Sequence, residues 1–197
     1  MTNREIEQVA NEVLTKYLKK GGSHKILNEI MATEAIKYKE INSANDDFVG
    51  VLTKGNNGQA YIMVNGSISN DGRKHFTIAH ELGHHFLQHQ LTQNSFYCSH
   101  NEIVEEGVWQ NPIEQEANHF ATCLLMPEEK VKSAFICMLQ NSRKAKIKDY
   151  LHVKNDYTFS IWCGMRDSLM KRYGVSEAAI RYRLQQLNLA KFEFANK

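Results

Sequence analysis

The residue types best suited to chemistry lie together near the middle of the chain, in the run HELGH at residues 80–84. Residues four apart on a helix share one face, with Cβ atoms about 5–6 Å apart. Two imidazoles so placed can bind one zinc ion, at about 2.0–2.1 Å each. Glu81 lies one step round the helix, where it cannot join the histidines as a ligand but can reach a zinc-bound water. The spacing therefore predicts a hydrolytic zinc site, with His80 and His84 as ligands and Glu81 as catalytic base.

A zinc site within one chain needs a third protein ligand and keeps its fourth position for water. The candidates are the glutamates that follow the histidine pair: Glu102, Glu105, Glu106, Glu114 and Glu116. At about 100° per residue, Glu114 lies about 50° from the centre of its helix's apolar face, and Glu116 about 110°. Because a buried carboxylate needs a partner, Glu114 is the predicted ligand. As the N3 residue after an Asn111 N-cap, Glu114 can instead complete a capping box.

Other polar residues are assigned to supporting roles or to none. Asn118 stands one turn beyond Glu114 and can orient either Glu114 or a ligand histidine from behind. Three further histidines are not expected to bind the metal, since His85 and His89 point off the metal-facing side and His119 points away from the core. The donor that stabilises the oxyanion stays open among Tyr97, His100 and Tyr150.

Two helices and a hairpin must position these residues. The histidine helix is expected at 73–89, where apolar residues gather on one side, and the glutamate helix at 111–125, with Asn as N-cap and Pro at N1. Two strands joined by a glycine-bearing loop predict a hairpin at 48–52 and 59–65. Whether strand 59–65 offers an open edge to an extended substrate or is paired on both sides stays open. Further helices are expected at 1–20, 25–40, 128–139, 161–173 and 176–188, and residues 141–158 are expected to be a basic loop with a short helix.

These elements predict an α+β fold, in which a short antiparallel sheet packs on the active-site helix and the C-terminal part is mainly helical. At 197 residues and 22.7 kDa, the chain is expected to form a single metallopeptidase domain over residues 1–197. Within it, N-terminal helices occupy 1–40. The sheet, the HELGH helix and the glutamate helix occupy 41–140, and a basic helical part occupies 141–197.

Composition narrows the class of protein. With 42% hydrophobic and 23% charged residues, the chain is typical of a globular protein rather than of a disordered, collagen-like or disulfide-scaffold chain. No apolar run approaches the roughly 18 residues that cross a bilayer, and the amphipathic N-terminus lacks the features of a secretory signal. The four cysteines form no CxxC pair, which favours reduced thiols and a cytoplasmic location.

Charge is distributed unevenly and raises a nucleic-acid alternative. Residues 1–129 hold 10 Lys and Arg against 17 Asp and Glu, whereas residues 130–197 hold 14 against 5. Residues 161–189 also have a helix-turn-helix layout, with Ser176 as N-cap and with Arg181 and Arg183 expected to be exposed. Against DNA reading, Ile180 and Leu184 lie at a helical spacing that favours packing. A nucleic-acid partner is therefore the weaker alternative.

The motifs resemble those of the ImmA/IrrE family of zinc metallopeptidases. The resemblance rests on HFTIAHELGHHF, EQEANHFATCLLMP and the closing RYGVSEAAIRYRLQQLNL, and it spans roughly residues 25–190. Carried over by position, it implies His80, His84 and Glu114 as zinc ligands, Glu81 as catalytic base and a small gluzincin-like fold. The basic segment around residues 141–159 is not part of the family pattern.

The resemblance also implies an activity. Such an enzyme is a cytoplasmic endopeptidase, often encoded on phage or mobile elements, that cleaves a helix-turn-helix repressor through a zinc-bound water. No repressor domain is fused here, so the substrate is expected to be a separate protein. The alternative is a DNA-binding or repressor-binding regulator that uses no proteolysis. The cleavage site, activating signal and oligomeric state are not determined by the sequence.

Overall fold

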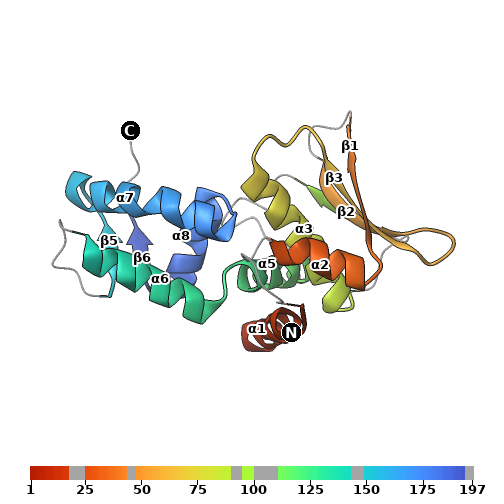
Figure 1. Cartoon of the computed structure of the whole chain (residues 1–197), viewed down its shortest axis with the longest axis horizontal. Helices are drawn as coiled ribbons and strands as arrows, with labels where there is room; N and C mark the ends of the chain where they lie inside the picture. The colour runs from red at the N-terminus through yellow and green to blue at the C-terminus, as the bar shows by residue number, and fades with distance from the viewer. Residues whose placement is uncertain (18–24, 44–47, 90–94, 100–110, 143–148, 194–197) are drawn as a thin grey trace.

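The computed structural model describes residues 1–17, 25–43, 48–89, 95–99, 111–142 and 149–193, with only the backbone for 95–99. The described helices are α1 (Asn3–Tyr17), α2 (Ile26–Thr33), α3 (Asp71–Phe86), α5 (Pro112–Leu125), α6 (Glu128–Asn141), α7 (Asp156–Tyr173) and α8 (Glu177–Gln186). The described strands are β1 (Lys37–Ile41), β2 (Phe48–Lys54), β3 (Ala60–Asn65), β4 (Ser95–Ser99), β5 (Leu151–Val153) and β6 (Ala190–Phe192). The predicted α+β class is confirmed. Figure 1 shows the larger sheet beside α2 and α3, and α6, α7 and α8 at the opposite end of the molecule.

The larger sheet has the order β1-β3-β2-β4 and is mixed. The expected hairpin is confirmed, because β2 and β3 pair antiparallel from Gly50 opposite Val64 to Lys54 opposite Ala60. The expectation of an antiparallel sheet holds for β2 with β3 and with β4 but is wrong for β1, which pairs with β3 in parallel. Between them, β1 and β2 occupy both sides of β3, so residues 59–65 offer no open edge to a substrate in the described part of the chain.

Strand β1 also corrects the helix expected at 25–40. Helix α2 ends at Thr33, and Ala35 takes a left-handed conformation with φ 52°. The amide of Ile36 then bonds to the Met31 carbonyl at 2.8 Å, which closes a Schellman turn. The following residues pair with β3 and are almost all exposed, and lysines on a sheet edge discourage pairing with other chains. A partner strand distant in sequence thus outweighed the local helical pattern.

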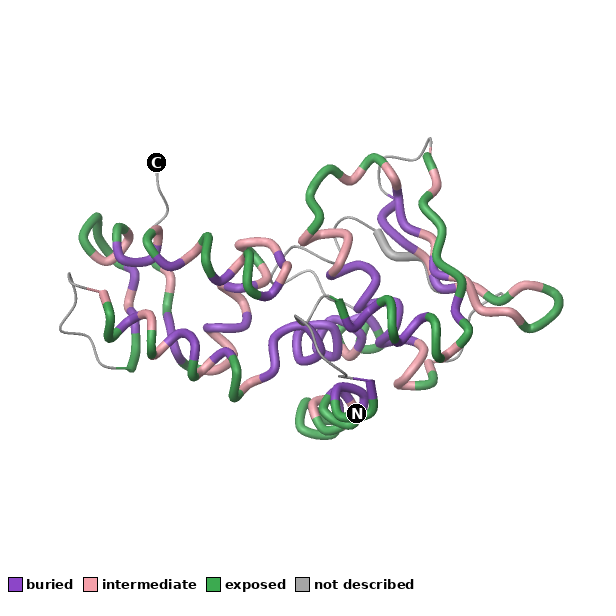
Figure 2. The backbone as a smooth tube through the Cα atoms, viewed as in Figure 1, coloured by how far each residue is buried: buried purple, intermediate pink, exposed green. Residues whose placement is uncertain are grey.

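The core that positions the site lies where α3 crosses α5 beneath the sheet. Buried residues form one continuous stretch in each helix, 76–84 in α3 and 117–125 in α5 (Figure 2), and α3 also contacts β2 and β3. Helix α1 packs against α5, and its residues Ile6, Ala10 and Val13 are buried. Each of these two helices is therefore covered on more than one face, which allows even its polar residues to be fully buried.

The C-terminal part departs from the expected loop at 141–158. Residues 151–153 form β5, parallel to β6, and α7 begins at Asp156 rather than 161 because Asn155 and Thr158 form a capping box. Ser176 caps α8 as expected, accepting from the Ala179 amide at 3.3 Å. None of the helices within the described ranges is apolar and long enough to span a membrane.

Candidate metal centre

Helix α3 presents the two predicted histidines inside the protein. Asn70 caps the helix by accepting from the Arg73 amide at 3.0 Å, so the helix starts two residues earlier than expected. His80 is 0% exposed and His84 is 1% exposed. Their Nε2 atoms lie 3.0 Å apart, as the four-residue spacing predicts for side chains on one helical face.

Helix α5 supplies the carboxylate. Asn111 caps it by accepting from the Ile113 amide at 3.0 Å, with Pro112 at the first helical position as expected. Glu114 is 6% exposed. Its Oε2 lies 3.0 Å from His80 Nε2 and 3.5 Å from His84 Nε2, so the carboxylate faces the histidine pair. We call His80, His84 and Glu114 the metal-binding group.

The donor atoms of this group fit one metal ion. Atoms about 2.0–2.1 Å from a tetrahedral ion are about 3.3 Å from one another. The three observed separations, between 3.0 and 3.5 Å, bracket that value. All three side chains are buried, and together they form a potential metal site in the described part of the chain.

The electrostatics favour the forms that bind a cation. Burial lowers the pKa of His84 to about 4, against the raising effect of its hydrogen bond with Glu114. Burial alone raises the pKa of Glu114, but hydrogen bonds and charges from His80 and His84 outweigh it and hold that pKa below its ordinary value. Near neutral pH the group thus contains a neutral imidazole at His84 and a carboxylate anion at Glu114, which are the protonation states of metal ligands.

Close approach of α3 and α5 brings the ligands together. A Cβ atom at Gly83 would lie 2.9 Å from the Ala117 carbonyl oxygen and 3.0 Å from Ala117 Cα. A side chain there would push the two helices apart. Glu114 lies on α5 and both histidines lie on α3. The absence of a side chain at Gly83 therefore keeps the three ligand residues close together.

Asn118 contacts His80, one of the two partners considered from the sequence. Its Oδ1 lies 2.8 Å from His80 Nδ1, on the side of the ring opposite the Nε2 that faces Glu114. Asn118 is 1% exposed, so this hydrogen bond is shielded from water. An acceptor at Nδ1 holds the proton there and leaves the lone pair on Nε2.

Glu81 lies against strand β2. It is 0% exposed, and a Cβ atom at Gly50 would lie 3.3 Å from Glu81 Oε1 and 2.4 Å from Thr77 Cγ2. The absence of a side chain at Gly50 therefore leaves room for the Glu81 carboxylate beside the sheet. Its role as catalytic base stays a prediction.

The remaining candidates fall in different places. Glu102, Glu105, Glu106, His100 and the Tyr97 side chain lie outside the described residues. Tyr150 is 40% exposed and precedes β5. Glu116 Oε2 lies 3.1 Å from His89 Nε2, and His89 Nδ1 lies 2.9 Å from His84 Nδ1. Helical geometry places His89 off the metal-facing side, but α3 ends at Phe86, so the turn that follows brings His89 onto the His84 ring.

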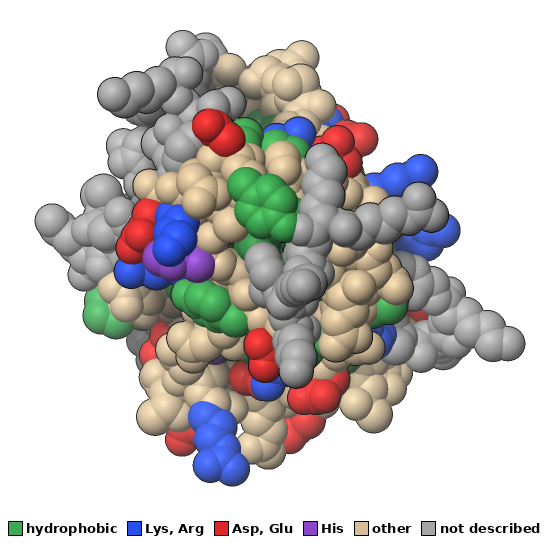
Figure 3. All heavy atoms as spheres, turned by 90° about the vertical axis from the view of Figure 1, so that its left-hand side faces the viewer, with side chains coloured by type: hydrophobic (Ala, Val, Ile, Leu, Met, Phe, Trp, Pro, Cys, Tyr) green, Lys and Arg blue, Asp and Glu red, His purple; other side chains and the backbone are tan. Residues whose placement is uncertain are grey.

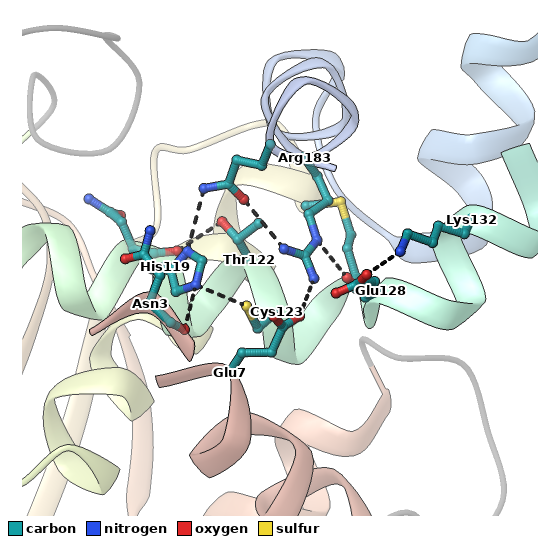
Figure 4. Close-up of polar contacts among 11 residues, drawn as sticks. Asn3, Glu7, His119, Thr122, Cys123, Glu128, Lys132 and Arg183 are labelled. Carbon is teal, nitrogen blue, oxygen red and sulfur yellow. Dashed lines mark hydrogen bonds and ion pairs between the residues drawn. The ribbon is translucent and has the colours of Figure 1, made fainter. Parts of the chain in front are cut away.

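One residue of α5, His119, and one residue of α8, Arg183, are buried although the sequence predicted otherwise (Figure 4). Arg183, expected to be exposed, has a side chain only 2% exposed, and it donates from Nε to the Met126 carbonyl at 3.0 Å and from Nη2 to Glu7 Oε1 at 2.8 Å. His119, expected to point away from the core, is 9% exposed, with Nε2 3.1 Å from the Asn3 carbonyl oxygen. Helix α1 covers both. We call Arg183, Glu7, His119 and Cys123 the Arg183 cluster.

The turn between α7 and α8, at the centre of the predicted helix-turn-helix layout, packs against α3. His75 Nδ1 on α3 lies 2.8 Å from the Gly174 carbonyl oxygen in the turn, and a Cβ atom at Gly72 would lie 2.5 Å from the Val175 carbonyl carbon. The turn that leads into α8, the helix that would read bases in a DNA-binding helix pair, therefore lies against α3. On the face of the C-terminal part shown in Figure 3, coloured acidic and basic side chains are interspersed.

The fold and the buried metal-binding group define a metallopeptidase of the H-E-x-x-H type. Residues 32–185 match the family described as the IrrE N-terminal-like domain, Peptidase_M78. This match covers more than half of the chain and agrees with the resemblance seen in the sequence. No curated protein matches the chain significantly. The chain belongs to the Peptidase_M78 family of metallopeptidases, and its substrate is accordingly a protein.

Proposed function

We propose that this protein is a zinc endopeptidase that cleaves a helix-turn-helix transcriptional repressor of a phage or mobile element. One observation carries the peptidase assignment. Two imidazole nitrogens and one carboxylate oxygen, borne by an H-E-x-x-H helix and a neighbouring helix, meet within 3.0–3.5 Å in a Peptidase_M78 chain.

Zinc is the metal best matched to this donor set. Two imidazoles and one carboxylate are typical of catalytic zinc sites, whereas magnesium and calcium prefer oxygen ligands alone. His80, His84 and Glu114 would hold the ion. When bound, zinc supplies Lewis-acid chemistry that activates water and polarises the peptide carbonyl.

The residues around the ligands would carry the proton transfers. Glu81 is proposed to take a proton from the attacking water and to deliver it to the leaving amine, as a general base and then a general acid. Its complete burial beside Gly50 keeps bulk water from competing for that proton. Asn118 is proposed to hold the Nδ1 proton of His80, so that Nε2 is free to bind the metal.

The repressor substrate and the location follow from the family resemblance. HFTIAHELGHHF and EQEANHFATCLLMP resemble ImmA/IrrE enzymes, for which such a repressor is the expected target. Cytoplasmic action is supported by the cysteines, since Cys123, Cys137 and Cys163 are all free thiols. The repressor is expected to be a separate protein.

The test is to incubate the zinc-loaded protein with helix-turn-helix repressors encoded beside its gene and to identify fragments by mass spectrometry. Glu81→Gln should lower cleavage by about 10²–10⁴-fold while zinc stoichiometry is retained. Glu29→Gln, a change at an exposed residue of α2, is the matched control and should cleave normally. If Glu81→Gln still relieves repression in full, the protein acts as a repressor-binding regulator without proteolysis.

The DNA-binding alternative is tested separately. Burial of Arg183 and packing of the α7–α8 turn on α3 count against it. We expect no shift of duplex DNA at low salt, where any phosphate contacts would be strongest. Binding that weakens steeply with added salt would instead support a nucleic-acid partner.

A further inference from the structure

A polar chain lies directly behind the metal-binding group. It begins at His84 Nδ1, which is 2.9 Å from His89 Nδ1, and it continues from His89 Nε2 to Glu116 Oε2 at 3.1 Å. The side chain of His89 is 7% exposed and that of Glu116 is 19% exposed. The chain is therefore largely shielded from solvent, and the residue at which it begins, His84, also faces Glu114.

The end of α3 places His89 there. The amide of His89 bonds to the His84 carbonyl at 3.1 Å, and the amide of Gln88 bonds to the His85 carbonyl at 3.3 Å. Gln88 has φ 56°, in the left-handed region. These are the two bonds and the reversed residue of a Schellman turn, in which the second residue beyond the C-cap folds back onto the last helical turn. That contact is usually apolar, but here it joins two imidazoles, with ring centroids 5.1 Å apart.

Metal binding would fix the direction of every hydrogen bond in this chain. His84 turns Nε2 toward the other ligand atoms, so its single proton must lie on Nδ1 when a metal is bound. That proton can be donated only if His89 Nδ1 is the acceptor. His89 then carries its own proton on Nε2 and donates it to the Glu116 carboxylate, which can only accept.

We propose that His89 and Glu116 are positioning residues that hold His84 in the orientation and tautomer required for metal binding. This inference rests on the proposed function, since it needs a metal bound by His84. Asn118 serves His80 in the same way, but through a neutral amide. On His84, the chain leads through His89 to the Glu116 carboxylate, whose other oxygen pairs with the N-terminal ammonium of Met1, and an anionic acceptor increases the electron-donating power of the imidazole. Each ligand histidine thus has its own hydrogen-bond partner: His80 has Asn118 of α5, and His84 has His89 of the turn after α3.

The experiment measures zinc affinity by competition with a chelator of known affinity, in variants that are first checked for folding without metal. His89→Leu should raise the zinc dissociation constant by about 10–100-fold. His85→Leu is the matched control, because His85 is a neighbouring histidine that instead contacts Glu34 at 3.4 Å. It should leave the dissociation constant within about twofold of the original value.

Conservative variants distinguish hydrogen bonding from packing. His89→Gln retains an acceptor for the His84 proton and should recover part of the affinity lost in His89→Leu. Glu116→Gln should weaken zinc binding less than His89→Leu, because its amide oxygen still accepts from His89. If the residues act as one chain, adding Glu116→Gln to His89→Leu should cause little further loss.

A direct readout is the tautomer of each ring in the zinc-bound protein, from nitrogen NMR of labelled histidines. We expect protonated Nδ1 on His84 and protonated Nε2 on His89. A zinc-binding, active wild type whose affinity is unchanged in His89→Leu, or a His89 ring protonated on Nδ1, would overturn the positioning role alone. A folded wild type that binds no zinc would overturn the proposed function and this inference together.

Discussion

The metal-binding group and the Arg183 cluster are both largely buried sets of ionisable side chains that join residues of α5 to residues of other helices, and they differ in how their charges are satisfied. In the Arg183 cluster, the cation belongs to the chain: the guanidinium donates to Glu7 and to the Met126 carbonyl at the end of α5. In the metal-binding group, His80, His84 and Glu114 turn nitrogen and oxygen atoms toward one point. Its cation would come from outside.

The comparison shows that burial of a charged residue does not by itself indicate a functional site. A buried ion pair whose partners are all within the chain links helices and specifies their packing. A buried cluster of imidazole nitrogens and a carboxylate oxygen that face one point at ligand distances indicates a metal, because a cation there can accept a lone pair from each of them.

The largest effect is expected for the charge of Glu114. Glu114→Gln retains the shape of the side chain but removes the anionic ligand, so the zinc dissociation constant should rise on the order of 1000-fold, since zinc-binding free energies of about 10–16 kcal/mol are shared among a few ligands. Glu7→Gln makes the same change in the Arg183 cluster and should leave zinc affinity within about twofold. Chelator competition measures both. Equal zinc affinity in the two variants would contradict the distinction between the sets.

Removing the cation of the Arg183 cluster should reduce stability rather than metal affinity. Arg183→Met leaves Glu7 and the Met126 carbonyl without their buried donor, at a cost of about 3–4 kcal/mol in the free energy of unfolding. Arg181→Met is the matched control. That guanidinium lies over the Phe192 ring, 4.6 Å from its centroid, and its loss should cost about 1 kcal/mol or less. Urea denaturation measures both, and similar costs for the two arginines would show that burial of Arg183 contributes nothing.

Acid should destabilise the metal-free protein through its histidines. The folded-state pKa of His84 is lowered to about 4 from an ordinary 6.5, chiefly by burial. Between these values the unfolded chain binds a proton that the folded chain does not, so the free energy of unfolding falls as pH falls through this window. We expect a loss of about 3 kcal/mol across this window. Glu114 has the same sign at lower pH, because its pKa is also lowered by the histidines in spite of burial.

Two histidine variants test whether His84 causes this loss of stability in acid. His84→Gln should flatten the dependence between pH 6.5 and 4, whereas His119→Gln should leave most of it. The pKa of His119 is also lowered by burial, so that residue contributes with the same sign. Denaturant titrations of the metal-free variants at several pH values measure the slopes. Stability that rises on acidification would contradict the lowered pKa of His84.

The smallest effects concern two helical glycines. Gly83→Ala places a Cβ atom against Ala117 and should cost about 1–3 kcal/mol while weakening zinc binding, because it separates α3 from α5. A Cβ atom at Gly164 in α7 meets nothing within 4 Å, so Gly164→Ala should stabilise the protein by about 0.5–1 kcal/mol. Thermal denaturation with and without zinc measures both changes. A Gly83→Ala variant of unchanged stability would show that the helices do not depend on their close approach there.

How well the sequence predicted each residue depended on how local the deciding interactions were. His80 and His84 were predictable because their spacing and the helix that carries them lie in one short segment. Glu114 was predictable from the apolar face of its own helix, although its position after the Asn111 cap also allowed a capping role. His89 was not, since its contact depends on the turn after α3, which Gln88 makes without the glycine that usually marks such a turn.

Residues whose surroundings come from distant segments were the ones misjudged. Lys37–Ile41 continues a helical pattern, yet β3 recruits it as a parallel strand. Arg183 and His119 were assigned from the faces of their own helices, but α1 lies over both of them. No periodicity within α5 or α8 contains information about a helix more than a hundred residues earlier in the chain.

The sequence by itself determined the family, the chemistry of the donor set and the helix faces that carry it, because residue type and a 3.6-residue repeat are properties of a short segment. Tertiary structure decided how far apart those faces lie, which polar residues stand behind the ligands and which charges are internally paired. Those features arise where α1, α3 and α5 pack together, and packing depends on all of their surfaces at once.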